Sequence, residues 1–174
     1  MPSAHRYARV EWERRFLLKQ FPDDEEVTYV RRIHDRYIES TRLRLRQMTG
    51  RDGDIVFKLT QKIPERAGPR QGLITSLYLS QSEFDVLAQL PAKTLAKTRH
   101  SLPPFGIDVF EGNLSGLILA EAEFNSAQEA LAAEIPAWAL SEVTEDLRFT
   151  GGSLAAATRG NLQQWLTDYG LDLP

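Results

Sequence analysis

Residues 10–18 of this chain read Val10-Glu11-Trp12-Glu13-Arg14-Arg15-Phe16-Leu17-Leu18. Taken at every second position, one set is apolar apart from Arg14, and the other set begins with the charged residues Glu11, Glu13 and Arg15. Alternation with a period of two predicts a β-strand whose two faces differ in chemistry. Alone, the pattern is typical of a surface strand with its polar side in water. Its return further along the chain favours another interpretation.

The charged alternation returns in several later segments. The basic members are Arg42, Arg44 and Arg46, then Lys58 and Lys62, then Lys97 and Arg99; the acidic members are Glu121 and Glu123, with Asp108 in a further short strand. Like charges at every second position of a strand repel one another, and solvated faces usually mix both signs. The segregation therefore predicts that these faces look inward, at a shared anionic ligand and a metal ion.

Composition limits the class of protein. The 174 residues fit a single domain spanning 1–174, and 42% hydrophobic with 26% charged residues is typical of a soluble globular protein. The net charge of −3 gives no basic excess for binding nucleic acid or an anionic membrane. We find no signal peptide or membrane-spanning run, so a cytoplasmic location is expected.

Metal chemistry based on cysteine is excluded because the chain contains no cysteine. Its three histidines, His5, His34 and His100, lie far apart in sequence, which does not favour a histidine-rich metal site. Carboxylates without histidine or cysteine suit hard cations such as Mg²⁺ or Mn²⁺. Arginine forks and lysine ammonium groups suit phosphate oxygens. No Gly-x-x-x-x-Gly-Lys loop occurs, so any phosphate must be bound through side chains.

The remaining patterns outline the elements. Strands are expected at residues 8–18, 42–48, 55–63, 73–79, 94–101, 107–110 and 117–124, with a hairpin turn at 49–54 and a loop at 64–72. Residues 27–38 fit no single element, although Tyr37-Ile38 fits the start of a strand. Helices are expected after Ser80, where Glu83 completes a capping box, at 128–134, and from Ser153 through Trp165.

These elements predict an α+β fold. About seven or eight strands with charged faces need a closed sheet, because only a barrel encloses a polar lumen that all of them share. We therefore expect an antiparallel β-barrel with a charged interior, whose apolar faces point outward and are covered by helices.

The segment Glu11-Trp12-Glu13-Arg14-Arg15 resembles the Glu-x-Glu-x-Lys signature of the CYTH superfamily, the triphosphate tunnel metalloenzymes. The resemblance continues, in the family's order, through Arg42-Leu43-Arg44-Leu45-Arg46, Leu59-Thr60-Gln61-Lys62, Lys97-Thr98-Arg99, Ile107-Asp108-Val109-Phe110, Ala120-Glu121-Ala122-Glu123-Phe124 and Glu142-Val143-Thr144-Glu145-Asp146. It implies an eight-stranded antiparallel tunnel that binds a triphosphate with one or two Mg²⁺ or Mn²⁺ ions. Members include inorganic, thiamine and RNA triphosphatases and class IV adenylate cyclases.

By this resemblance, the chain is a metal-dependent hydrolase of a linear triphosphate, either inorganic or the tail of a nucleotide or of thiamine triphosphate. The expected metal ligands are Glu11, Glu13, Asp108, Glu121 and Glu123, and the expected phosphate ligands are Arg42, Arg44, Arg46, Lys58, Lys62, Lys97 and Arg99. Two alternatives remain: a class IV-type adenylate cyclase and a non-catalytic triphosphate or polyphosphate binder. The expected partner is the small-molecule substrate, and neither nucleic acid nor a membrane is expected to bind. The protein is expected to be a monomer or a homodimer.

Arg15 occupies the place of the signature lysine and, with Glu11 and Glu13, is expected at the catalytic centre. Arginine stays protonated, so it can bind phosphate or orient water but cannot act as a base. The chain departs from the family elsewhere too. Residues 73–79 carry no acid, and three arginines, Arg42, Arg44 and Arg46, stand where two are needed. Glu142 and Asp146 fit a structural role or the tunnel edge.

Overall fold

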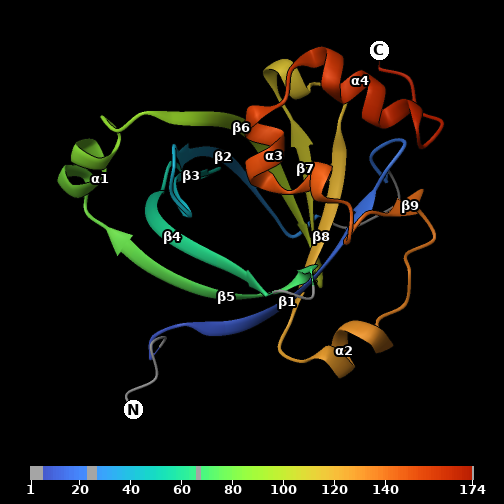
Figure 1. Ribbon diagram of the computed structural model, residues 1–174, viewed down its shortest axis with the longest axis horizontal. Coiled ribbons are helices and arrows are strands. Elements are labelled where there is room, and N and C mark those ends of the chain that lie inside the picture. The colour runs from blue at the N-terminus through green and yellow to red at the C-terminus, as the bar shows by residue number, and fades with distance from the viewer. Residues whose placement is uncertain (1–5, 23–26, 66–67, 174) are drawn as a thin grey trace.

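Eight antiparallel strands close into a barrel, as the sequence predicts (Figure 1). The computed structural model describes residues 6–22, 27–65 and 68–173. The barrel strands are β1 (Arg9–Leu17), β2 (Tyr29–Ile38), β3 (Leu43–Gly50), β4 (Ile55–Glu65), β5 (Gly68–Leu79), β6 (Ala92–Leu102), β7 (Phe105–Phe110) and β8 (Ile118–Phe124). Their order around the barrel is β1-β5-β4-β3-β2-β6-β7-β8.

The strand β1 closes the ring. Its first half pairs with β5 and its second half with β8, and Trp12 is paired on both sides, with Gln71 and with Phe124. The pairing of β1 with β5 stops at Trp12, and further along β1 the short strand β9 (Ser141–Glu142) pairs with Phe16 and Leu17. The segment that carries Glu11, Glu13 and Arg15 is therefore the seam of the barrel.

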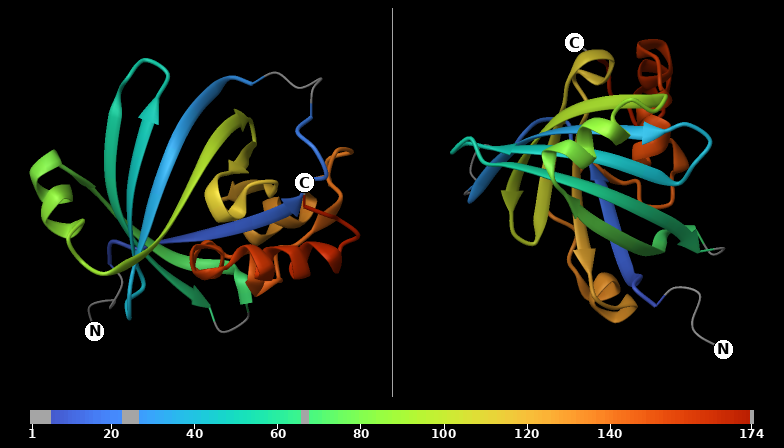
Figure 2. Two further views of the ribbon diagram at one scale, coloured as in Figure 1. Left: turned by 90° about the horizontal axis from the view of Figure 1, so that it is seen from above. Right: turned by 90° about the vertical axis from the view of Figure 1, so that its left-hand side faces the viewer.

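The helices lie outside the strands. They are α1 (Gln81–Leu87), α2 (Ala127–Ala132), α3 (Gly151–Ala156) and α4 (Arg159–Thr167), with 3₁₀ turns η1 (Gly112–Leu114) and η2 (Leu147–Phe149). Figure 2 shows the β3–β4 hairpin projecting away from α3 and α4. Among the residues described, no helix is both long and apolar enough to cross a bilayer.

The helix caps confirm part of the sequence-based prediction and correct another part. Ser80 and Glu83 form the predicted capping box at the start of α1. The single helix expected from Ser153 is instead two helices, because Thr158 and Asn161 form a second capping box that begins α4.

Two segments differ from the prediction. Residues 27–38, which fitted no element, contain the ten-residue strand β2, whose lumen-facing set of Ile33, Asp35 and Tyr37 mixes apolar, acidic and aromatic side chains. The loop expected at 64–72 is largely strand, since β4 reaches Glu65 and β5 begins at Gly68. Pro64 is tolerated because β3 pairs with β4 only as far as Gln61, which leaves the end of β4 with a free edge.

The main apolar core closes one end of the barrel. Lumen-facing residues at the end of β1 and on neighbouring strands pack against side chains from η2, α3 and α4; the cluster includes Leu17, Leu95, Phe110, Leu119, Phe149, Leu154, Leu162 and Leu166. A second core around Phe16 and Ile107 lies on the outer face, beneath Trp138. The lumen is therefore charged along part of its length and apolar where the C-terminal helices cover it.

Candidate active site

Charged side chains from strands that are not neighbours meet inside the barrel. Lys62 extends from β4 past β5 to β1, where its Nζ lies 3.2 Å from Glu11 Oε1 and 2.5 Å from Glu13 Oε2. Such a contact requires both side chains to point into the lumen. The charged alternation of residues 10–18 thus marks the inner face, as the sequence predicts.

Asp108 on β7 forms the centre of a buried group of charges. Its carboxylate accepts hydrogen bonds from Lys97 Nζ at 2.5 Å and from Arg99 Nε and Nη2 at 2.6 Å each. Arg99 also bonds Glu121 on β8. Burial raises the pKa of Glu121, but Lys97, Arg99 and Arg15 outweigh it and hold that pKa well below its usual range. Asp108, expected among the metal ligands, is here engaged by two cations.

A second buried carboxylate, Asp35 on β2, was not among the residues expected from the sequence. It accepts two hydrogen bonds from Arg46, from Nε at 2.6 Å and from Nη2 at 2.7 Å, and lies 3.8 Å from Arg44 Nε. Burial raises the pKa of Asp35, but the charges of Arg46, Arg44 and Lys97 and the Arg46 hydrogen bonds lower it to about 2. The only signal in the sequence was the alternation of Ile33, Asp35 and Tyr37.

Arg15 links the seam of the barrel to the C-terminal segment. Its guanidinium donates to the carbonyl oxygens of Phe149 at 2.7 Å and Thr144 at 3.0 Å, and its Nε lies 2.8 Å from Glu13 Oε1. Arg15 is only 2% exposed. These contacts fix the position of Glu13 and of the segment that covers the apolar end of the lumen.

Arg14, the exception in the apolar set, has a structural role on the outer face. Its guanidinium bonds Glu142 with Nη2 at 2.7 Å from Oε2, and Nη1 donates to the carbonyl oxygens of Ala130 and Ala133 at the end of α2. Asp146 pairs with Arg148. Of the two roles that the sequence left for Glu142 and Asp146, these contacts favour the structural one.

A third group contains the acids Glu11, Glu13 and Glu123. Glu13 and Glu123 are direct partners in the β1–β8 register, and Arg9 Nη2 lies 3.2 Å from Glu11 Oε2 and 3.3 Å from Glu123 Oε2. Burial and the neighbouring carboxylate of Glu11 raise the pKa of Glu123, although Arg9 opposes them. Within the described part of the chain, no three carboxylate or imidazole groups converge on a ready-made metal centre. The donors themselves suit a hard divalent cation, because they are carboxylates that repel one another.

The remaining expected phosphate ligands differ in exposure. Lys58 on β4 is half-buried; burial and the charges of Arg44 and Arg46 lower its pKa. Repulsion between these cations would be relieved by an anion placed among them. Arg42 precedes β3 and is exposed. The wall formed by β3 and β4 thus presents Arg44, Arg46 and Lys58 to the lumen.

The two histidines in the described part of the chain, His34 and His100, take no part in these charge groups. His34 is exposed, and the ring of His100 packs edge-on against Phe21 with centroids 4.8 Å apart. His5 lies outside the described residues.

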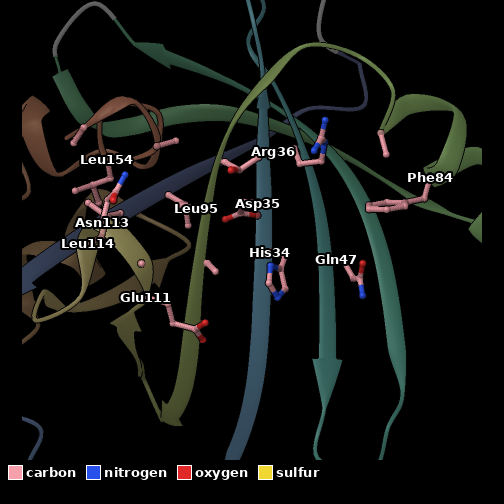
Figure 3. A pocket seen from close by; sticks show the side chains of 16 residues that line it. His34, Asp35, Arg36, Gln47, Phe84, Leu95, Glu111, Asn113, Leu114 and Leu154 are labelled. Atoms are coloured by element: carbon pink, nitrogen blue, oxygen red, sulfur yellow. The ribbon is translucent and has the colours of Figure 1, made fainter. Parts of the chain in front are cut away.

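A cavity of about 810 Å³ lies outside the barrel, over β2 and β6 and between α1 and α3 (Figure 3). His34 and Gln47 line its floor, Phe84 one wall and Leu154 the other. Its charged lining residues are Asp35, Arg36 and Glu111, fewer than the acids and bases that meet in the lumen. The lumen, identified by its charges, is therefore the better candidate for the active site.

Known proteins of similar sequence and structure point the same way. An inorganic triphosphatase of Nitrosomonas europaea (strain ATCC 19718) is 35% identical over 155 residues, which cover 83% of this chain and 96% of that protein. Two solved structures, titled hypothetical protein NE1496 and inorganic triphosphatase NE1496, both have a TM-score of 0.56. They are 30% and 29% identical and cover 85% and 84% of this chain, and 99% and 95% of their own. No family model matches the chain.

Proposed function

The chain belongs to the CYTH superfamily, the triphosphate tunnel metalloenzymes, and from this membership we propose that it hydrolyses inorganic tripolyphosphate. It is a triphosphatase-type hydrolase. The observation that carries the proposal is the closed lumen in which cations of the three strands β3, β4 and β6 share the interior with one acid-rich seam. The substrate class is taken from the relative named inorganic triphosphatase.

In the proposed complex the cations of the lumen hold the phosphate chain. They are Arg44, Arg46, Lys58, Lys62, Lys97 and Arg99, while Arg42 at the start of β3 would meet the chain only at the edge of the tunnel. Water attacks the terminal phosphorus, the bond from that phosphorus to the bridging oxygen breaks, and pyrophosphate leaves together with orthophosphate. Because phosphoryl transfer needs little covalent help from a protein, these cations act by positioning the chain and stabilising its charge.

We propose that Glu11, Glu13 and Glu123 hold a Mg²⁺ or Mn²⁺ ion, with Glu121 at the edge of this group. The raised pKa of Glu123 supports this, because it reflects burial of the carboxylate and, next, the negative charge of Glu11, which Arg9 does not fully offset. A divalent cation there would offset substrate charge and polarise the phosphoryl group. The contacts of Asp108 favour another role, in which it fixes Lys97 and Arg99.

Arg15, Glu11 and Glu13 remain our candidates for the catalytic centre. The guanidinium of Arg15 is bonded to two carbonyl oxygens and paired with Glu13, which favours orienting that carboxylate over proton transfer. A carboxylate of the seam would then accept the proton from the attacking water, and a divalent cation, when bound, would lower the pKa of that water.

Arg15 also favours one rival, a binder that does not turn over its ligand. We would measure phosphate release from tripolyphosphate, ATP and thiamine triphosphate, each with Mg²⁺ and with Mn²⁺. Release from tripolyphosphate supports the proposal. A cyclase would instead form a cyclic nucleotide from ATP, and a binder would show a raised melting temperature with tripolyphosphate but no release.

We also propose that the protein acts in the cytoplasm as a monomer or homodimer. The sequence contains no cysteine, so the fold has no disulfide that a reducing compartment such as the cytoplasm could break.

A further inference from the structure

Asp35 is a buried carboxylate in the cationic wall to which the proposed reaction gives no role. It is 1% exposed, whereas the Arg44 side chain keeps 23% of its surface and the Arg46 side chain 10%. A carboxylate among groups that must bind an anion weakens their attraction for it. Its presence therefore needs a compensating benefit.

The geometry of the Asp35–Arg46 pair provides one. Asp35 accepts from Nε and Nη2 of Arg46, so two of the five N–H groups of a planar fork are fixed. The Nη1 side of the guanidinium is thereby turned away from Asp35 and β2. Arg46 is flanked by β2 on one side and by its register partner Lys58 on the other. The free edge of Arg46 consequently faces the same part of the lumen as Lys58.

Arg44 is held by the same carboxylate, more loosely. Its Nε lies 3.8 Å from Asp35 Oδ1, and Asp35 raises the pKa of Arg44 against the effect of burial. The two arginines of β3, which would otherwise repel each other and Lys58, thus share one anchor.

We propose that Asp35 is a positioning residue of the phosphate site, which orients Arg46 and steadies Arg44 so that their free N–H groups meet the phosphate chain. The inference rests on the proposed function. It differs from simple charge balance, which would make Asp35 a residue that only weakens anion binding.

The test compares Asp35→Asn, Arg46→Gln and the double variant with the parent, using tripolyphosphate hydrolysis and calorimetric binding. Asparagine keeps the shape but offers one acceptor in place of two, so Arg46 loses its fixed orientation. We expect KM and Kd of Asp35→Asn to rise roughly tenfold with kcat nearly unchanged. This is the result when a variant loses a contact that is equally strong in the ground state and in the transition state. Glu111→Gln, which removes the acid of the Arg32–Glu111 pair outside the lumen, is the matched control and should match the parent.

The double variant separates positioning from charge balance. If Asp35 is a positioning residue, the double variant binds tripolyphosphate as Arg46→Gln does or more weakly, because Arg44 also loses its anchor. Tighter binding by the double variant would overturn the inference, as would unchanged or tighter binding by Asp35→Asn. If Asp35→Asn does not fold, the comparison of Arg46→Gln with the double variant still decides.

A parent that neither binds nor hydrolyses tripolyphosphate overturns the proposed function and this inference together. An active parent whose Asp35→Asn variant binds and hydrolyses tripolyphosphate unchanged overturns the inference alone.

Discussion

Lys62 Nζ lies 2.5 Å from Glu13 Oε2, although β4 and β1 are separated in the sheet by β5. Burial lowers the pKa of Lys62, but Glu13 and Glu11 outweigh it and raise that pKa above its usual value. Lys62, which we propose binds phosphate, is thus paired with Glu11 and Glu13, which we propose bind the metal ion. Lys62 and a divalent cation would compete for the same carboxylates.

The first prediction follows from this competition. Lys62→Gln should weaken tripolyphosphate binding by roughly tenfold, through the loss of a charge-assisted contact. The same change should strengthen Mg²⁺ binding, because Glu11 and Glu13 lose the ammonium that neutralises them. Calorimetry with each ligand alone measures both effects. Lys93→Gln, which removes an exposed cation 3.8 Å from Glu39, should alter neither affinity. Weaker Mg²⁺ binding by Lys62→Gln would argue against competition.

The second prediction concerns the acid group itself. Glu123→Gln should lower the hydrolysis rate by on the order of a hundredfold and weaken Mg²⁺ binding, since it removes one of three adjacent carboxylates. Glu134→Gln, at an exposed position away from the lumen, should behave like the parent. Full activity in excess EDTA would rule out the proposed metal dependence.

The barrel and its charged interior could be predicted because the inner face of most strands carries charges of one sign. The pairs Glu11 with Glu13 and Lys97 with Arg99 are recognised in the sequence by their period of two. The resemblance to the family then gives the order of these charged segments along the chain. The structure then shows what local alternation cannot: cations of basic strands pair with acids of strands that are not their neighbours in the sheet. Lys62 pairs with Glu13 and Arg99 with Glu121, so charges of opposite sign offset one another in the lumen.

The residues that could not be predicted are those whose roles depend on distant partners. Asp35 sits between Ile33 and Tyr37, a set without a clear period, and its importance comes from Arg46 on the next strand. Arg15 is fixed by the carbonyl oxygen of Thr144, 129 residues away in sequence. Backbone acceptors carry no signal in a sequence, because every residue has one.

The third prediction uses the lowered pKa of Asp35. Because its folded-state pKa is about 2 against an ordinary 3.8, the ionised carboxylate stabilises the fold above pH 4, and this contribution is lost as the pH falls toward 2. The shift corresponds to about 2 kcal/mol of unfolding free energy. Urea unfolding at pH 7 and pH 2.5 should show that the stability gap between the parent and Asp35→Asn narrows by about two thirds of this amount, because Asp35 is still partly ionised in the folded protein at pH 2.5. A gap that is equal at both pH values would contradict the assignment.

The fourth prediction concerns Arg15→Lys. One ammonium cannot span the carbonyl oxygens of Phe149 and Thr144 together with Glu13, so the variant should lose about 2 kcal/mol of stability in urea unfolding. It should keep its affinity for tripolyphosphate, because one positive charge replaces another. A lysine, unlike an arginine, can lose its proton at alkaline pH, so the ratio of its hydrolysis rate to that of the parent should rise with pH.

Arg14→Lys is the matched control for this variant. Arg14 also bonds two carbonyl oxygens and one carboxylate, that of Glu142, but on the outer face of the same strand. Its replacement should cost similar stability without changing the pH–rate profile, which separates loss of packing from loss of a lumen charge. The contrary outcome is an Arg15→Lys protein that binds tripolyphosphate normally but hydrolyses it more slowly than the parent at every pH. It would show that catalysis depends on the guanidinium contacts that hold Glu13, and that the family's lysine has no equivalent role at this position.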